Sequence, residues 1–271
     1  MMTKKIKKYS HTFVVCAYQK CKYLEECVKS LKNQTVLPSV IMVTSTDNDY
    51  IRNIASKYKI KLYVRNGESD IQDDWNFGYS KAKSDLVTIA HQDDVYDSKY
   101  LENVLKYFKK YNDTLYVSTN YYVLKNGKLE IDLNSKLKRI LKYPLKSACF
   151  NRFKLFKVGS LMVGNSVNCP SVTYNKNILG TSNIFTSTLK FSLDWDTFLK
   201  LSRMKGRVGY IDKRLICYRI HSNATTVKFI NNDKRTEEDI IMFRKMWPKA
   251  FIPIIMKFYS KASDTYGGCD E

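Results

Sequence analysis

The chain has 271 residues, of which 44% are hydrophobic and 27% charged; 46 Lys and Arg residues against 26 Asp and Glu give a formal net charge of +20. This composition excludes a disordered or fibrous protein and suffices for one large α/β domain or two tightly packed halves. The charge predicts an anionic partner, which can be nucleic acid, an anionic membrane surface or a phosphorylated small molecule.

The cysteines number seven and form no CxxC pair. We expect reduced thiols in a cytosolic protein. A zinc site from Cys16, Cys21 and Cys27 is the weaker alternative, because their spacing matches no known ligand pattern. No apolar run reaches the ~18–20 residues that span a bilayer, and no apolar stretch follows the basic N-terminus as in a signal peptide. These features predict a cytoplasmic protein.

Strand and helix patterns alternate along the first part of the chain. Short apolar runs predict strands at 12–17, 40–43, 61–64 and 85–90. Apolar residues at helical spacing predict helices at 23–32, 49–58, 73–83 and 98–111. Such alternation indicates a parallel sheet covered by helices. Ligands of open sheets of this kind bind beyond the carboxyl ends of the strands.

The second part of the chain is less regular. Apolar runs predict strands at 115–123, 170–174, 208–211 and 215–218. Helical patterns occupy 135–141, 193–203 and a tail at 237–260 that Pro248 and Pro253 interrupt. The 125–157 segment carries ten basic residues against Glu130 and Asp132.

Polar residues follow three of the predicted strands, at Ala17-Tyr18, at 44–47 and at 91–94. In the last of these, His91-Gln92-Asp93-Asp94, carboxylates can hold a divalent cation through their oxygens. Such a cation would neutralise a nucleotide diphosphate and stabilise it as a leaving group. The alternative is a helix N-cap with solvated acids.

A second acidic motif, Asp194-Trp195-Asp196, opens the helix at 193–203. A carboxylate there can act as general base on an acceptor hydroxyl, a role we assign to Asp194. Asp196 either contributes to the acceptor site or stabilises the helix N-terminus electrostatically. Trp195, like Trp75, supports the apolar face of a sugar ring or packs in the core.

A third motif, Tyr218-Arg219-Ile220-His221, ends a short predicted strand. Arg219 and His221 are two residues apart, so in an extended chain they face the same side. Together they can contact phosphate oxygens or a metal. The alternative is a salt-bridged arginine and an exposed histidine.

These motifs occur in an order and at spacings that resemble the family 2 glycosyltransferases of bacteria. The similarity covers about residues 10–225 and rests on the segments 13–18, 30–35, Asn76-x-Gly78, Asp93-Asp94, Asp194 and Tyr218-Arg-x-His221. It implies an α/β GT-A (Rossmann-like) fold with a mostly parallel sheet flanked by helices. It also implies a nucleotide-sugar donor, Mn²⁺ or Mg²⁺, and inversion at the anomeric carbon. Asp93 matches the metal-binding position and Asp194 the general base.

Three positions depart from the family pattern. Thr44-Ser45-Thr46, with Asp47 beyond, stands where two acids commonly occur; His91 replaces the first acid of the metal motif; and Trp75 replaces an arginine before Asn76. Recognition of the base can therefore differ, and a UDP-sugar is only slightly favoured. The predicted donor-binding residues are Ala17, Tyr18, Ser45, Asp47, Asp74, Trp75, Asn76, His91, Gln92, Asp93 and Arg219. The predicted metal ligands are Asp93 and His221, and the predicted acceptor residues are Trp195 and Asp196.

The resemblance also suggests an organisation and a setting. We expect a nucleotide-sugar-binding half at 1–125, an acceptor-binding half at 126–225, and a basic amphipathic helical tail at 226–271. The acceptor would be a glycan, a lipid-linked sugar or a glycoprotein, as in bacterial surface polysaccharide or cell-wall polymer synthesis. The tail suits an anionic membrane surface, which would make the protein peripheral on the inner face of the membrane, or it packs on the domain.

Two other functions remain as alternatives. The net charge is compatible with nucleic-acid binding, but the sequence lacks a helix-turn-helix, a zinc finger or an aromatic RNA-binding motif, so we expect no nucleic-acid partner. A nucleotidyltransferase shares the α/β layout and the metal requirement. Such enzymes usually carry a glycine-rich phosphate loop, whereas the corresponding turn here, at 18–21, contains no glycine.

Overall fold

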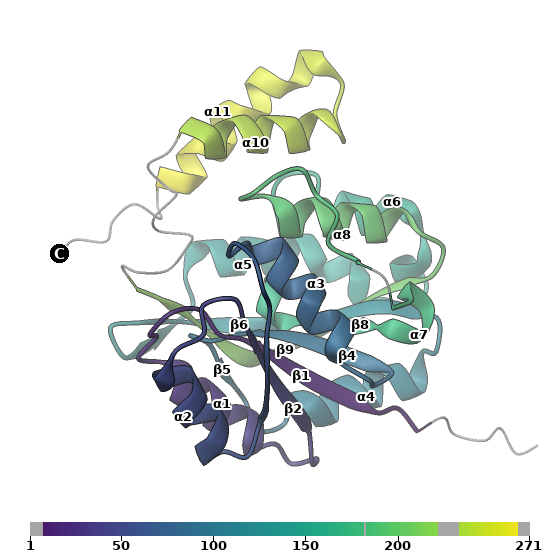
Figure 1. The fold of residues 1–271 in the computed structure, drawn as a ribbon. Coiled ribbons are helices and arrows are strands. Elements are labelled where there is room, and N and C mark those ends of the chain that lie inside the picture. The colour runs from purple at the N-terminus through teal and green to yellow at the C-terminus, as the bar shows by residue number, and fades with distance from the viewer. Residues whose placement is uncertain (1–7, 182, 222–232, 265–271) are drawn as a thin grey trace, which may run out of the picture.

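The computed structural model describes residues 8–181, 183–221 and 233–264. Within these residues a single nine-stranded sheet runs in the order β3-β2-β1-β4-β8-β6-β9-β5, with β7 paired to β6 (Figure 1). Helices cover both faces of the sheet, as the sequence predicts for an α/β protein.

The parallel part of the sheet contains the four strands expected in the first part of the chain. These are β1 (His11–Cys16), β2 (Ser39–Thr44), β3 (Lys61–Val64) and β4 (Leu86–His91). Strand β1 lies between β2 and β4, with Val14 in register with Ile41 on one side and Ile89 on the other. Because these strands are parallel, their carboxyl ends meet at one edge.

The remaining strands make the sheet mixed. They are β5 (Val95–Tyr96), β6 (Thr114–Lys125), β7 (Lys128–Glu130), β8 (Val172–Asn175) and β9 (Arg207–Ile220). Strand β8 is antiparallel to β4 and β6, whereas β6 and β9 are parallel. The two short strands expected at 208–211 and 215–218 are a single strand, because a register shift in the β6–β9 ladder accommodates the polar residues between them.

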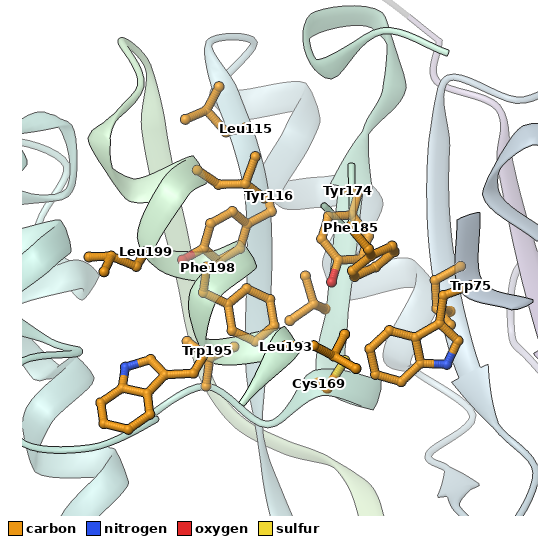
Figure 2. Packing of buried hydrophobic residues seen from close by; sticks show 14 of the residues in the cluster. Trp75, Leu115, Tyr116, Cys169, Tyr174, Phe185, Leu193, Trp195, Phe198 and Leu199 are labelled. Atoms are coloured by element: carbon orange, nitrogen blue, oxygen red, sulfur yellow. The ribbon is translucent and has the colours of Figure 1, made fainter. Parts of the chain in front are cut away.

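Helices separate into two layers. Helices α1 (Leu24–Lys32), α2 (Asp49–Lys57) and α4 (Tyr100–Lys110) bury one face of the sheet around Phe13 and Val15. Helices α3 (Ile71–Lys81) and α8 (Leu193–Arg203) pack on the other face around Val14. Figure 2 shows part of this second cluster, where Trp75 contacts Phe185 and Tyr116 contacts Phe198.

Shorter helices fill the connections of the second part of the chain. They are α5 (Leu133–Lys142), α6 (Lys154–Gly159) and α7 (Lys176–Leu179), with 3₁₀ turns η1 (Tyr143–Lys146), η2 (Phe150–Arg152) and η3 (Cys169–Ser171). No helix within the described residues has the length and apolar character needed to cross a bilayer.

The tail forms α10 (Asp233–Arg244), the turn η4 (Lys249–Phe251) and α11 (Ile252–Asp264), which lie over α8 in Figure 1. Phe243 and Tyr259 pack against the ring of Trp195, so the inner side of the tail belongs to the core. The chain breaks near Pro248 as expected, but Pro253 lies in the first turn of α11. Proline is tolerated there because the backbone N–H groups in the first turn of a helix have no carbonyl acceptor within the helix.

Gly78 sets the distance between α3 and the sheet. A Cβ at this position would lie 2.5 Å from a methyl carbon of Val14 and 3.2 Å from one of Val43. Both valines are fully or almost fully buried, so neither can move away easily. The Gly of Asn76-x-Gly78 therefore allows α3 to approach the strands that carry the predicted site.

We expect Gly78→Ala to lower the free energy of unfolding by about 1–3 kcal/mol, because the added methyl group overpacks a closed interface. Urea denaturation measures this. Gly159→Ala is the matched control, since a Cβ there meets nothing within 4 Å. Equal stability of the Gly78→Ala variant and the unaltered chain would contradict this account of the α3 contact.

Candidate active site

The carboxyl ends of β1, β2 and β4 are held together by hydrogen bonds. The N–H of Tyr18 donates to Oε1 of Gln92 (2.9 Å), and Nε2 of Gln92 donates to the carbonyl of Tyr18 (3.0 Å). The N–H of Ala17 donates to the carbonyl of Val43 (2.9 Å). The structure thus brings Ala17, Tyr18 and Gln92 to one rim of the sheet, with the ring of Tyr18 partly exposed.

Three ionisable groups cluster where β4 ends. Ligand atoms of His91, Asp93 and Asp94 lie within 4.8 Å of one another. Nε2 of His91 and Oδ2 of Asp94 are buried, and neither has a hydrogen-bond partner among the described residues. Buried polar atoms of this kind are normally satisfied, so two of them in one cluster indicate a missing ligand. Imidazole and carboxylate groups are a donor set that Mn²⁺ accepts.

Electrostatics at this cluster depend on burial. Burial, followed by the negative charge of Asp93, raises the pKa of Asp94 well above its ordinary value. Burial also pushes the pKa of Asp93 upward, but the hydrogen bond from His221 helps to bring that pKa below its ordinary value. Burial lowers the pKa of His91, which favours the neutral imidazole that binds metals. A cation would relieve the cost of ionising Asp94.

Arg219, at the end of β9, is the residue that connects this cluster to the second part of the chain. Its backbone N–H donates to Oδ1 of Asp94 (2.9 Å), and its Nε donates to the carbonyl of Asp93 (2.8 Å). Its guanidinium also pairs with Glu26 (2.6 Å) and lies 4.1 Å from the ring centre of Tyr23. All of these partners are supplied by β4's end or the start of α1.

His221 contacts Asp93 directly, with Nε2 3.0 Å from Oδ2 of Asp93. Its ring also packs on Tyr23, 5.0 Å between centres. The structure therefore places His221 as the partner that orients Asp93. We predicted His221 as a metal ligand from the sequence, and a ligand role is compatible with this position because the two groups adjoin.

Two of the predicted donor-binding acids, Asp74 and Asp47, lie near the end of β2 but have different partners. Asp74, from α3, accepts hydrogen bonds from the hydroxyl of Ser45 (2.7 Å) and from Nε of Arg65 (2.7 Å). Its carboxylate thus lies beside the strand end where family members commonly have acidic residues. Asp47 is turned toward Arg52, with which it forms an ion pair.

Trp75 and Asn76 are largely enclosed. The side chain of Asn76 exchanges two hydrogen bonds with the backbone of Phe185, at 2.7 and 3.1 Å. Trp75 stacks on His91, with 5.2 Å between ring centres. Asn76 therefore joins α3 to the loop before α8, and Trp75 covers one side of the cluster at the end of β4.

Asp194 lies at the start of α8 and keeps part of its surface accessible. Oδ2 accepts from the amide of Asn165 (2.9 Å), and Oδ1 accepts from the N–H of Trp195 (2.7 Å). Burial raises the pKa of Asp194, while the positive charge of Lys138 opposes that rise. A raised pKa suits a group that must take a proton.

Cys169 relates Asp194 to the cluster at the end of β4. Burial raises the pKa of the Cys169 thiol, and the negative charges of Asp194 and, more weakly, Asp94 add to that rise. Both carboxylates are thus within electrostatic range of one buried thiol, although they are a hundred positions apart in the chain. Figure 2 shows Cys169 beside Leu193, the residue that precedes Asp194.

The two residues after Asp194 face the core. The indole N–H of Trp195 donates to the carbonyl of Leu161 (3.1 Å), and its ring packs on Phe243. Asp196 is buried, with its two oxygens paired to Lys200 (2.8 Å) and Lys245 (2.6 Å). These contacts favour the structural alternatives for both residues, core packing and helix stabilisation, over acceptor binding.

Sequence reasoning passed over several members of the site. Asp94 was noted only as part of the Asp93-Asp94 pair, although its buried oxygen faces the cluster. Glu26, Tyr23 and Lys138 were not singled out, because no local pattern marks an ion pair or a ring contact made across the fold. The only sequence feature that pointed to Asp94 was its position directly after Asp93.

Residues 12–166, more than half of the chain, match the family model described as "Glycosyl transferase family 2". No curated protein matches the chain.

Solved structures share its fold. S. aureus TarS 1-349 in complex with UDP-GlcNAc matches with a TM-score of 0.65 and 16% identity, covering 95% of this chain and 73% of that chain. The mannosyltransferase PcManGT from Pyrobaculum calidifontis, in complex with GDP-Man and Mn²⁺, matches with a TM-score of 0.64 and 13% identity, covering 98% and 77%. These similarities confirm the predicted GT-A fold.

Replacing Arg219 by Met should lower the free energy of unfolding by about 2–4 kcal/mol, because hydrogen bonds of a charged group contribute roughly 1.5–3 kcal/mol each. Glu26→Gln is the matched control. The Glu26 side chain is 53% exposed, so its loss should cost less than about 1 kcal/mol. Thermal or urea unfolding of both variants distinguishes them, and equal effects would show that Arg219 does not hold β9 to the end of β4.

Proposed function

The chain belongs to glycosyl transferase family 2, and on that premise we propose that it transfers a sugar from a nucleotide-diphosphate donor to a hydroxyl group, with inversion and with the help of a divalent cation. The observation that carries this proposal is the cluster of His91, Asp93 and Asp94, with its two unsatisfied buried atoms, at the rim where β1, β2 and β4 end. In open α/β sheets this rim is where nucleotides bind.

His91, Asp93 and Asp94 would hold the cation, Mn²⁺ or Mg²⁺, and His221 would orient Asp93 through their hydrogen bond. When bound, the cation neutralises the donor diphosphate and stabilises it as a leaving group. Arg219 fixes the backbone of Asp93 and the carboxyl of Asp94. It thereby keeps the ligand groups in place before the donor arrives.

Asp194 is the proposed general base. The acceptor oxygen attacks the anomeric carbon as the bond between that carbon and the phosphate oxygen breaks. The acceptor proton passes to Asp194, and the nucleoside diphosphate leaves. Asn165 positions the carboxylate through its 2.9 Å hydrogen bond. A displacement of this kind inverts the anomeric configuration, because the acceptor attacks from the side opposite the leaving group.

Asp74 is the residue we propose for recognition of the nucleoside. It is held at the end of β2 by Ser45 and Arg65. There it would replace the two acids that family members commonly have where this chain has Thr44-Ser45-Thr46. Similar structures hold UDP-GlcNAc in one case and GDP-Man in another, so the fold accepts more than one base. UDP-GlcNAc and GDP-Man are therefore the first donors to test.

The acceptor is proposed to be a glycan, a lipid-linked sugar or a glycoprotein of a bacterial surface polymer. The tail supports a location at a membrane. Its inner side packs on the domain, while Phe251, Ile254 and Phe258 are exposed at helical spacing along its outer side. We assign the three parts of the chain, 1–125, 126–225 and 226–271, to donor binding, acceptor binding and this peripheral attachment.

Asp194→Asn should reduce the turnover number by about 10²–10⁴-fold, because it removes the general base while leaving a side chain of the same shape. Asp93→Asn should abolish the stabilisation by Mn²⁺ plus donor in a thermal-shift assay. Asp73→Asn is the control, since Asp73 is exposed in the first turn of α3. Release of nucleoside diphosphate is the activity readout. Full activity of the Asp194 variant refutes the mechanism, and release of pyrophosphate indicates a nucleotidyltransferase.

The pH profile of kcat/KM should have an acid limb set by Asp194. A base works only when ionised, so the rate falls as the pH drops through its pKa, which burial raises above the ordinary Asp value of about 3.9. Removing the opposing charge with Lys138→Met should move this limb to higher pH. Lys136→Met, an exposed neighbour on the same helix, should leave it in place. An unchanged limb in both variants would exclude Asp194 as the titrating base.

A further inference from the structure

Helix α5 has its apolar and cationic faces reversed relative to an ordinary surface helix. Leu133, Leu137 and Ile140 follow the spacing of one helix face, and they are 72%, 45% and 67% exposed. On the opposite face Ser135 and Lys142 are buried and Lys138 is half-buried. Amphipathic helices normally turn their leucines inward and their lysines outward.

The inner face of α5 is fixed by polar contacts. Asp132 caps the helix by accepting from the N–H of Ser135 (2.8 Å). The ammonium group of Lys142 lies 4.7 Å from the ring centre of Tyr210 and makes no hydrogen bond to another described residue. Arg139 forms two hydrogen bonds with Asp212, at 2.8 and 2.9 Å. These contacts hold the helix in this orientation without using its apolar row.

Large apolar side chains that flank the helix in the sequence are exposed too, namely Leu129 and Ile131 before it and Tyr143 after it. Soluble domains rarely expose an apolar row such as Leu133, Leu137 and Ile140 unless it meets a partner or a membrane. We call this surface, made of Leu129, Ile131, Leu133, Leu137, Ile140 and Tyr143, the α5 face.

Charge identifies the partner. Lys128 and Lys136 are exposed beside the residues of the α5 face. A second copy docked through the same face would bring these positive charges together, which disfavours association. An anionic bilayer offers both an apolar interior and negative head groups to a face of this composition.

We propose that the α5 face docks on an anionic lipid surface, with Leu133, Leu137 and Ile140 inserted at the boundary between head groups and acyl chains. This docking surface is separate from the membrane attachment proposed for the tail, because α5 lies in the predicted acceptor half.

The position of α5 gives this docking a consequence that rests on the proposed function. The positive charge of Lys138, on the inner side of the helix, acts on Asp194. The lipid would lie on the outer side, across the diameter of one helix, about 10–12 Å. With the proposed function, an acceptor anchored in the bilayer would then be presented on the side of the protein that carries Lys138, whose charge reaches Asp194.

Sedimentation of the full chain with vesicles tests the proposal. We expect binding to phosphatidylglycerol vesicles, little binding to phosphatidylcholine vesicles, and weaker binding at high salt. The triple variant Leu133→Ser, Leu137→Ser, Ile140→Ser should bind phosphatidylglycerol at least about 100-fold more weakly, since each aliphatic side chain contributes about tenfold or more when buried. The single variant Leu133→Ser, at the most exposed of the three positions, should lose about tenfold and guards against misfolding of the triple variant.

Leu37→Ser is the matched control, because Leu37 is 95% exposed outside the α5 face and should bind like the unaltered chain. Failure of the unaltered chain to bind vesicles, or equal binding by the triple variant, overturns the proposal. A dimer that the triple variant abolishes overturns it in favour of a second copy as the partner.

The same proteins separate this inference from the proposed function. Asp194→Asn should keep full vesicle binding, and the triple variant should keep metal-dependent hydrolysis of a soluble nucleotide sugar. If the chain binds vesicles but the Asp194→Asn variant is fully active, lipid docking through the α5 face stands and the proposed mechanism is refuted. If the chain turns over the donor but does not bind vesicles, the proposed function stands and lipid docking is refuted.

Discussion

The contact between Asp94 and Arg219 is the interaction on which the rest of the site depends. A carboxyl group buried at the end of β4 is costly unless it is hydrogen-bonded or neutralised. The backbone of Arg219 satisfies one of its oxygens, and the guanidinium binds the neighbouring carbonyl of Asp93. The other oxygen of Asp94 has no hydrogen-bond partner among the described residues, and the proposed cation would bind there. Asp93 and Asp94 therefore need the end of β9 beside them, because it carries Arg219. The acids of the candidate site come from the first part of the chain, and the second part supplies the residue that holds them.

The topology of the sheet makes this contact possible. Strand β9 runs beside β6 and pairs with the short strand β5, which directly follows the acids of β4. Asp212, in the middle of β9, would interrupt an ordinary strand. Here it lies at a register shift and accepts hydrogen bonds from Asn120 and Arg139. One continuous strand can therefore carry Arg219 and His221 to Asp93, whereas two separate strands would not fix their position.

Local patterns in the sequence predict most of the helices and strands, because an element that buries one face repeats its apolar residues at a regular spacing. They also predict that Asp93 and Asp194 carry the chemistry. They could not predict that Asp74 lies beside Ser45, or that Asn76 binds the backbone of Phe185, since these contacts join residues that only the fold brings together. Two strands were predicted in place of the single strand β9, because Asp212 and Lys213 interrupt the apolar run. No local pattern in the sequence indicates a register shift. The enclosure of Asp196 depends on Lys245 from the tail, which is equally invisible to a local pattern.

Two exceptions to the usual rules of burial occur in this molecule. At the end of β4 an acid is buried without full compensation, and on α5 lysines turn inward while leucines face outward. The positive charge of Lys138, on the inner side of α5, opposes the rise that burial causes in the pKa of Asp194. Turning α5 over would bury its leucines but carry Lys138 away from Asp194. In the observed orientation the apolar row of α5 faces outward and can meet a surface outside the protein.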